Sequence, residues 1–189
     1  MLKKDLRKLY KQKREALTTA QKLKWDDLIL IQFQTLDIPF VSYVMSFYSI
    51  AEKSEVDSFA ITDFLHFRNP SLTLAYPRMD VSQHTMEAVV APPDAAFNSN
   101  EFGITEPFGN QLLHPNDIDL ILVPMLACDE TGHRVGYGKG YYDRFLSECR
   151  EDCLKIGLSY FEPVSLINDT ADYDVPLNFC ITPQQVYVF

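Results

Sequence analysis

Glycine, paired cysteine motifs and long apolar runs are scarce or absent in this chain. Only seven of its 189 residues are glycine. No run approaches the roughly 18 apolar residues that a membrane-spanning helix needs, and the opening segment MLKKDLRKLYKQKR has no apolar stretch typical of a secretion signal. We therefore expect a cytoplasmic protein with no membrane partner.

The four cysteines have no spacing that indicates a metal site or a disulfide framework. No two of them are separated by the two residues typical of zinc and redox motifs. Cys149 and Cys153 are four residues apart, which on a helix places two side chains on one face. We expect four free, buried thiols in a reducing compartment.

Basic residues are in the minority overall, which disfavours a general nucleic-acid-binding role. The chain has 17 lysines and arginines against 26 acidic residues, and its formal net charge is −9, whereas nucleic-acid-binding surfaces are basic. The charge is unevenly distributed, because residues 1–24 carry a net +7 and the remainder −16. This basic segment predicts either an anion held near the N-terminal helix or a solvated helix surface.

Hydrophobic periodicity predicts alternating helices and strands. A basic amphipathic helix is expected over residues 1–17, and Thr18 with Gln21 forms a capping box that begins a second helix reaching the mid-30s. The apolar run at 118–124 is typical of a central strand covered on both faces. The other expected strands are 41–49, 71–76, 84–90, 154–160 and 184–189, and the other expected helices are 55–67, with an apolar stripe that includes Phe67, and 141–150.

These elements predict the α/β class. Residues 91–116 are rich in proline, glycine and asparagine and have no period, which is typical of a long functional loop. We expect a single domain over residues 1–189, with a Rossmann-like, open, mostly parallel sheet that is flanked by helices.

Four of the seven glycines lie within nine positions, in the segment GHRVGYGKG (132–140). This segment follows the apolar strand, and ligands of open α/β sheets bind beyond the carboxyl ends of the strands. Glycines there permit positive φ angles, and their N–H groups attract anions. Lys139 adds a point charge and Arg134 a planar fork, both suited to phosphate. The segment therefore predicts a phosphate-binding loop.

The glycine spacing matches neither a Walker A loop nor a dinucleotide-binding fingerprint, so a long tight turn without a ligand is the alternative. Asp143 follows the loop directly. Beside a phosphate its carboxylate is suited to Mg²⁺, which prefers one or two carboxylates plus phosphate oxygens. Without a phosphate, the only role indicated for Asp143 is a favourable interaction of its charge with the dipole of the helix that follows.

The glycine-rich segment and its surroundings resemble a known family. DLILVPMLACDETGHRVGYGKGYYDRFL (119–146) resembles, without gaps, the signature of the 5-formyltetrahydrofolate cyclo-ligase family, also called methenyltetrahydrofolate synthetases. Five further segments resemble family motifs in the same order, so the resemblance covers essentially the whole chain. They are KKDLRK (3–8), EVDS (55–58), YPR (76–78), FGITEP (102–107) and DVPLN (174–178).

The resemblance implies an ATP- and Mg²⁺-dependent enzyme that converts 5-formyltetrahydrofolate to 5,10-methenyltetrahydrofolate, with release of ADP and phosphate. ATP phosphorylates the formyl oxygen, and N10 of the folate then closes the ring as phosphate leaves. This chemistry depends on positioning and charge neutralisation more than on acid–base groups. The implied partner is the small-molecule folate, with or without a polyglutamate tail, and no nucleic acid; we expect a monomer.

The family's functional residues carry over to the matching positions of this sequence. The resemblance implies catalytic roles for Arg134 and Lys139, and Mg²⁺ binding by Asp143 and Asp174. The implied ATP contacts are Lys3, Lys4 and Arg7 of the basic helix, and Arg134, Val135, Gly136, Tyr137, Gly138, Lys139, Gly140, Tyr141 and Tyr142. The implied folate contacts are Ile50, Glu55, Phe102, Tyr137, Gly138, Lys139, Gly140 and Tyr141.

The folate contacts have alternatives in the sequence. Glu55 is either a ligand of the pterin ring or the N-terminal acid of the helix expected at 55–67. The spacing before Glu55 leaves Ser49 open in place of Ile50. Phe102 is as well suited to core packing as to a folate ring.

The sequence also departs from the family pattern outside the phosphate loop. Asp172 lies beside Asp174, which leaves the metal assignment open between the two carboxylates. Further departures leave the details of the folate pocket and the C-terminal loop open. They are Met125, Cys128, Pro163 and Tyr173, which stand where the family usually has other residues.

Other functions fit parts of the sequence. A sugar-phosphate or CoA-ester enzyme on a related α/β scaffold would use the glycine loop for phosphate and need a carboxylate, for which Glu106 is the candidate. A non-catalytic folate or nucleotide binder would bind its ligand without turnover. An RNA binder that uses the basic segment is disfavoured by the net charge of −9.

Overall fold

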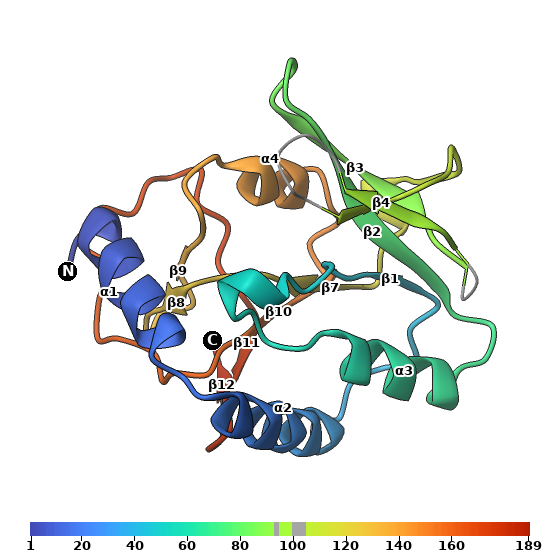
Figure 1. Ribbon diagram of the computed structural model, residues 1–189. Coiled ribbons are helices and arrows are strands. Elements are labelled where there is room, and N and C mark those ends of the chain that lie inside the picture. Colours follow the sequence, from blue (N-terminus) through green and yellow to red (C-terminus); the bar gives the residue numbers. More distant parts are fainter. Residues whose placement is uncertain (93–94, 100–104) are drawn as a thin grey trace.

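The structure, a computed structural model, describes residues 1–92, 95–99 and 105–189. Within these ranges one large sheet has the strand order β12-β11-β10-β7-β1-β2-β3-β6 (Figure 1). Its strands are β1 (Tyr43–Met45), β2 (Thr73–Asp80), β3 (Thr85–Val90), β6 (Leu112–Leu113), β7 (Leu120–Val123), β10 (Leu154–Leu158), β11 (Phe179–Ile181) and β12 (Val186–Val188). The central pairs are parallel, and β3, β6 and β12 are antiparallel additions at the edges. The predicted α/β class with a mostly parallel sheet is confirmed.

Three helices cover the two faces of the large sheet: α2 (Thr19–Gln34), α3 (Phe59–Arg68) and α4 (Tyr141–Ser147). A fourth helix, α1 (Lys3–Glu15), precedes them in the chain. Figure 1 shows α2 and α3 on one face and α4 on the other. Successive side chains of a strand point to opposite faces, so Leu120 and Leu122 of β7 join the core with α2 and α3, while Ile121 and Val123 pack with α4. Both faces of β7 are therefore buried, as its apolar sequence predicts.

The helix α1 packs against a separate two-stranded sheet, formed by β8 (Ala127–Cys128) and β9 (Arg134–Val135). Leu6 and Tyr10 are the buried apolar residues of α1, and they cluster with Ala127 and Val135 of this small sheet. Because β9 leads directly into residues 136–140 of the glycine segment, this packing fixes the basic helix beside those glycines.

The first two expected helices are confirmed, including the capping box. Thr18 Oγ1 accepts the N–H of Gln21 at 3.2 Å, and the Gln21 side chain accepts the N–H of Thr18 at 3.0 Å. These two bonds satisfy donors that the first turn of α2 leaves free, which explains why the helix begins at Thr19.

The helix expected from residue 55 begins later, at Phe59. Side chains hold residues 55–58 in a non-helical path: Asp57 Oδ1 accepts the N–H of Phe59 at 2.9 Å, and Ser58 Oγ donates to the Phe47 carbonyl at 2.6 Å. The prediction that Phe67 belongs to the buried apolar stripe of this helix is wrong, because Phe67 is 85% exposed. Ile61 and Leu65 lie on the buried side.

Other boundaries also differ from the expectation. Only residues 43–45 of the expected strand 41–49 are a strand, and the helix expected to reach residue 150 ends at Ser147. Cys149 and Cys153 therefore do not share a helix face. All four cysteines are free as predicted, but the expected burial is wrong for Cys149, which is half-buried. The strand β11 was not expected. The segment 91–116 contains β4 (Phe97–Ser99), β5 (Thr105–Pro107), β6 and a 3₁₀ turn, Pro115–Asp117.

Gly157 of β10 lies where the sheet meets the segment that carries Met125. A Cβ atom at this position would lie 2.7 Å from both Leu177 Cδ1 and Met125 Cε. We expect Gly157→Ala to lower the free energy of unfolding by about 1–3 kcal/mol, because this core must shift to admit a methyl group. Urea unfolding followed by Trp25 fluorescence measures it. Gly109→Ala, whose Cβ meets only ordinary contacts at 3.7 Å, is the matched control, and equal stability losses in the two variants contradict the prediction.

No helix in the described ranges combines the length and the apolar composition needed to cross a membrane.

Candidate functional site

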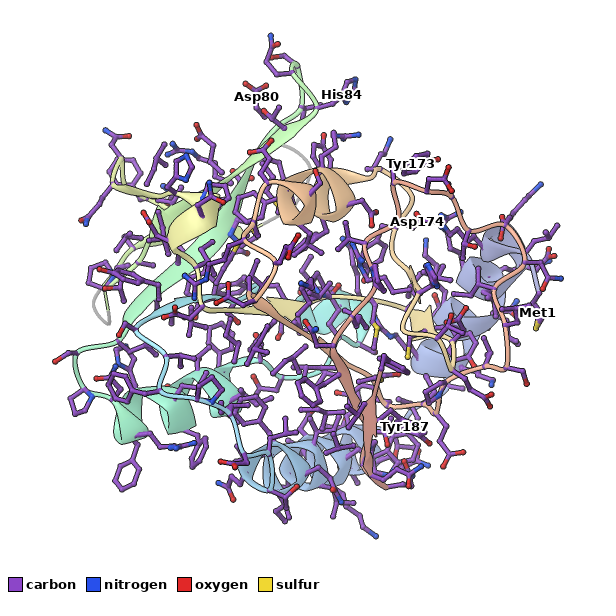
Figure 2. The ribbon with its side chains drawn as sticks, turned by 180° about the vertical axis from the view of Figure 1, so that it is seen from behind. Met1, Asp80, His84, Tyr173, Asp174 and Tyr187 are labelled. Atoms are coloured by element: carbon purple, nitrogen blue, oxygen red, sulfur yellow. The ribbon has the colours of Figure 1, made fainter. Side chains whose placement is uncertain are left out.

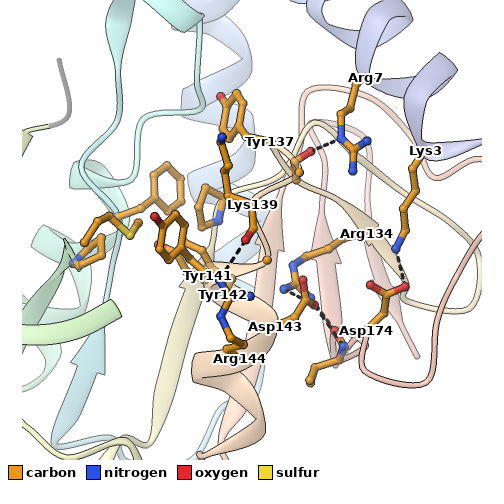
Figure 3. A pocket seen from close by; sticks show the side chains of 18 of the residues that line it. Lys3, Arg7, Arg134, Tyr137, Lys139, Tyr141, Tyr142, Asp143, Arg144 and Asp174 are labelled. Atoms are coloured by element: carbon orange, nitrogen blue, oxygen red, sulfur yellow. Dashed lines mark hydrogen bonds and ion pairs between the residues drawn. The ribbon is translucent and has the colours of Figure 1, made fainter. Parts of the chain in front are cut away.

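A cavity of about 850 Å³ opens at the carboxyl ends of the parallel strands. Phe47 and Tyr48 follow β1, Pro124 follows β7, and the glycine segment and the loop 169–175 complete the wall, with α1 along one side (Figure 3). This is the edge at which open α/β sheets bind ligands. Cavities of a few hundred to about 1,000 Å³ are typical of small-molecule sites.

The glycine segment lines this cavity with backbone atoms. Gly138 and Gly140 have φ angles of +92° and +70°, which residues other than glycine rarely adopt. Among the described residues, none accepts a hydrogen bond from the main-chain N–H groups of residues 136–143. Those donors include the first turn of α4, where a helix N-terminus favours anions. The loop therefore has the form of an anion-binding site, and no described group of the protein accepts its hydrogen bonds.

Gly132 has a different role from the other three glycines. It lies in the turn between β8 and β9 with a φ of +85°, and a Cβ there would lie 2.9 Å from the Leu177 carbonyl oxygen. It does not line the cavity. Its conformation serves the close packing of the turn and not the ligand loop.

Arg134 and Asp143 form a partly buried ion pair at the base of the loop (Figure 3). Arg134 Nη2 lies 2.8 Å from Asp143 Oδ1, and the Arg134 side chain is only 4% exposed. Arg134 Nη1 donates to the Val175 carbonyl at 2.5 Å, and the Val175 N–H donates to Asp143 Oδ1 at 3.3 Å. Burial lowers the pKa of Arg134, while Asp143 opposes that shift. The pair ties the start of α4 to the loop 169–175.

Lys3 of α1 and Asp174 form a second ion pair in the same cavity. Figure 2 places Tyr173 and Asp174 on the loop that runs between α4 and α1. Burial alone would raise the pKa of Asp174, but the hydrogen bonds from Lys3 Nζ and the Ala171 N–H, with the charge of Lys3, bring it below its ordinary value. The Asp174 carboxylate is therefore ionised throughout the neutral range.

Glu55 lies in the cavity wall and is held by two donors. Tyr137 donates its hydroxyl proton to Glu55 Oε1, and the Ile50 N–H donates to Glu55 Oε2 at 2.9 Å. Burial, followed by the charge of Glu55, raises the pKa of Tyr137. Because α3 begins at Phe59, Glu55 is not a helix N-terminal acid, and that alternative is wrong.

The glycine loop is also tied to the hairpin of β2 and β3, whose tip carries Asp80 and His84 (Figure 2). Arg144 Nε donates to the His84 carbonyl at 2.9 Å, and Arg144 Nη2 donates to the Lys139 carbonyl at 3.0 Å. The guanidinium also lies 5.5 Å from the centre of the Tyr141 ring. Arg144 thus supports the loop at its solvent side.

Most of the site residues expected from the sequence meet in this one cavity. The predicted residues that line it are Lys3, Arg7, Ile50, Glu55, Arg134, Gly136, Tyr137, Gly138, Lys139, Gly140, Tyr141, Tyr142, Asp143 and Asp174. Lys4 is exposed and Val135 is buried against α1, and neither lines the cavity. Phe102 lies outside the described residues. Ser49 does not line the cavity, and its hydroxyl donates to the Val56 carbonyl at 2.7 Å.

The sequence reasoning assigned no role to several residues that line the cavity. Tyr48, Pro77 and Met79 form an apolar wall near the ends of β1 and β2, and Tyr173 and Arg144 lie at its other sides. Position at the carboxyl end of a predicted strand was a usable signal for Tyr48 and Pro77. No comparable signal marks Tyr173, because it belongs to a loop without a period.

The carboxylates in the cavity fit a magnesium ion that takes phosphate oxygens as its other ligands. Among the described residues no group of three or more His, Cys, Asp or Glu side chains is arranged to hold a metal. Within that part of the chain, Asp143 Oδ2 and Asp174 Oδ1 have no hydrogen-bond partner. Two carboxylates with one free oxygen each match the preference of Mg²⁺ for one or two carboxylates plus substrate phosphates. Asp172 also lines the cavity, so the choice between it and Asp174 stays open.

The carboxylate required by the sugar-phosphate or CoA-ester alternative does not line the cavity. Glu106 Oε1 accepts the N–H of Met79 at 2.9 Å, which joins β5 to β2. Its role in the described structure is to link two strands.

Comparison with known proteins gives the same family over the whole chain. The model of the 5-formyltetrahydrofolate cyclo-ligase family matches residues 2–183. The 5-formyltetrahydrofolate cyclo-ligase of Mycoplasma pneumoniae is 30% identical over 188 residues, which cover 97% of this chain and all of that protein. The protein of the same name from Mycoplasma genitalium is 46% identical over 72 residues, which cover 38% of this chain and 44% of that relative.

Solved structures show the same fold. The NMR structure of Aquifex aeolicus 5,10-methenyltetrahydrofolate synthetase matches with a TM-score of 0.81 and 29% identity, over the whole of this chain and 93% of that one. The 5,10-methenyltetrahydrofolate synthetase from Mycoplasma pneumoniae matches with a TM-score of 0.74 and 26% identity, over 97% of this chain and 99% of that one. Together with the cavity and its residues, these matches show that the chain belongs to the 5-formyltetrahydrofolate cyclo-ligase family.

Proposed function

We propose that the protein converts 5-formyltetrahydrofolate and ATP to 5,10-methenyltetrahydrofolate, ADP and phosphate, in the cytoplasm and with Mg²⁺. The formyl oxygen takes the terminal phosphoryl group of ATP, N10 attacks the activated carbon, and that oxygen leaves with the phosphate. The observation that carries the proposal is one cavity lined by the glycine loop, whose N–H groups have no acceptor among the described residues, by basic side chains and by Glu55. Membership of the family supports it.

The phosphates of ATP fit the end of the cavity formed by α1 and the glycine loop. Arg7 lines this end and holds the loop by donating from Nε to the Gly136 carbonyl at 3.0 Å. Lys139 is exposed on the loop, and Arg134 lies beneath it with its charge held in a dry environment. Cations and backbone donors fixed in such a place stabilise the charge that develops as a phosphoryl group moves. We assign Arg134 and Lys139 to that task, and Mg²⁺, held by Asp143 and Asp174, would neutralise further phosphate charge.

The folate fits the end that Glu55 and the apolar wall form. A carboxylate accepts two N–H donors from a pterin ring, and the hydrogen bonds from Tyr137 and Ile50 fix the orientation of Glu55 before any ligand arrives. Tyr48, Pro77 and Met79 offer apolar surface to the rings. In the proposed arrangement the formyl group lies between Glu55 and the phosphate loop, where the two substrates must meet.

A purified-protein assay tests the proposal directly. The protein is mixed with 5-formyltetrahydrofolate, ATP and Mg²⁺, and the absorbance of the methenyl product is followed together with ADP release. We expect product and ADP in equal amounts, and no product when ATP or Mg²⁺ is omitted. A folded protein that binds 5-formyltetrahydrofolate without turnover would instead be a non-catalytic binder. If sugar phosphate or acyl-CoA stabilises the protein against unfolding and ATP with Mg²⁺ does not, the protein would be a sugar-phosphate or CoA-ester enzyme.

A further inference from the structure

Arg14, near the end of α1, is a buried cation with no carboxylate partner in the described part of the chain. It is only 4% exposed. Its guanidinium donates from Nη2 to the Met125 carbonyl. It also donates from Nη1 to the Tyr137 hydroxyl, and these two atoms are 3.5 Å apart. A buried charge without an opposite charge in contact is costly, so the hydrogen bonds that Arg14 donates must offset that cost.

The direction of these hydrogen bonds fixes the proton of Tyr137. A guanidinium is always a donor, so the Tyr137 oxygen accepts from Arg14 and must donate its own proton elsewhere. The acceptor is Glu55 Oε1. The chain Arg14–Tyr137–Glu55 therefore has one polarity, in which the carboxylate is the final acceptor. The Arg14 end of this chain is buried and its Glu55 end reaches solvent, since Arg14 is 4% exposed and Tyr137 37%.

The helix α1 thus holds the glycine loop at two points. Arg7, two turns before Arg14, donates to the Gly136 carbonyl at 3.0 Å, and Arg14 donates to the side chain of the next residue. Arg7 lines the cavity, whereas Arg14 lies behind its wall. Of the two groups that accept from Arg14, Tyr137 lines the cavity and Met125 does not, so Tyr137 is the contact through which Arg14 reaches a ligand.

We propose that Arg14 is a positioning residue of the folate end: it fixes the Tyr137 hydroxyl and, through it, the orientation of Glu55. This inference rests on the proposed function in one respect, namely that Glu55 binds the folate. It assigns a task to a cation of the basic helix that does not touch either substrate. It also separates the two arginines of α1, because Arg7 serves the phosphate end and Arg14 the folate end.

The test compares Arg14→Met with Lys8→Met, which removes the same charge from an exposed position on the same helix. We expect Arg14→Met to raise the KM for 5-formyltetrahydrofolate about 10-fold, as expected when a hydrogen bond to a charged group is lost, with the KM for ATP changed less than about 2-fold. Lys8→Met should change neither. Arg14→Lys, which keeps the charge and one donor, should give an intermediate KM for the folate.

A double-mutant cycle with Tyr137→Phe tests the route of the effect. If Arg14 acts through the Tyr137 hydroxyl, Arg14→Met should change folate KM far less in the Tyr137→Phe background than in the wild type. The free protein gives a readout without any substrate: with ¹³C-labelled tyrosine, the Tyr137 Cζ resonance should shift in Arg14→Met and not in Lys8→Met. Should Arg14→Met not fold, the cycle and the resonance are measured with Arg14→Lys.

The outcomes separate this inference from the proposed function. A wild type without turnover overturns the proposed function, while a shifted Tyr137 resonance still supports the Arg14–Tyr137 link. An active wild type in which the Arg14 variants raise both KM values equally, or act additively with Tyr137→Phe, overturns the positioning role. An unshifted Tyr137 resonance in folded Arg14 variants overturns the link itself.

Discussion

Asp143→Asn is expected to lower kcat by roughly 100- to 1,000-fold, as expected when the charge that holds a catalytic magnesium ion is removed. Asparagine has the same size, and its oxygen can still accept from Arg134 and the Val175 N–H, which Asp143 Oδ1 accepts in the wild type. The missing component is the negative charge. The methenyl absorbance assay measures kcat over a range of Mg²⁺ concentrations.

The Mg²⁺ dependence decides between two roles for Asp143. If its carboxylate binds the ion, the variant should need a higher Mg²⁺ concentration for half-maximal activity. If it only holds Arg134, the loss should be independent of Mg²⁺. Asp152→Asn is the matched control. It removes the ion pair between Asp152 Oδ1 and Arg150 Nε, which are 2.8 Å apart, at an exposed aspartate outside the cavity. A kcat in Asp143→Asn within 3-fold of Asp152→Asn would falsify the metal assignment.

Gly138→Ala is expected to raise the KM for ATP by about 10- to 100-fold, since an alanine forced to a positive φ strains the loop by 1–3 kcal/mol. The φ of Gly138 is +92°, and a Cβ there would lie 3.2 Å from Arg7 Cζ. The substitution therefore disturbs both the backbone donors and the arginine that holds them. Initial rates at varied ATP, with saturating folate, measure the effect.

Gly136→Ala provides the comparison within the same loop. Gly136 has no positive φ, and a Cβ there would meet nothing within 4 Å. We expect the KM of Gly136→Ala for ATP to stay within about 3-fold of the wild type, because the alanine does not strain the loop backbone. Similar KM values for the Gly138 and Gly136 variants would show that the conformation of the loop does not control nucleotide binding.

Much of the fold could be predicted from the sequence because its signals are local. The capping box at Thr18 and the apolar run at 118–124 identify their elements by residue type and spacing alone. The start of α3 could not be predicted, since it depends on where Ser58 and Asp57 find acceptors and donors in three dimensions. Phe67 shows the same limit: its spacing fits an apolar face, yet no element in the described part of the chain covers it.

The candidate site divides in a similar way. The glycine spacing, Lys139 and Asp143 lie within one short segment, so their proximity follows from the sequence. Val135 lies in the same segment but points into the cluster with Leu6, because β9 alternates its side chains between two sides. Membership in a functional motif therefore does not fix the direction of each side chain.

By itself the sequence determined the order of helices and strands, the conformational freedom of the loop at residues 136–140 and the family to which the signature points. Only the tertiary structure decided which distant residues meet: Glu55 with Tyr137, 82 residues away, Lys3 with Asp174, 171 residues away, and Arg14 with Met125, 111 residues away. The physical reason is that helix propensity and turn chemistry act over a few residues, whereas these contacts exist because sheet order and helix packing bring separate segments to one edge.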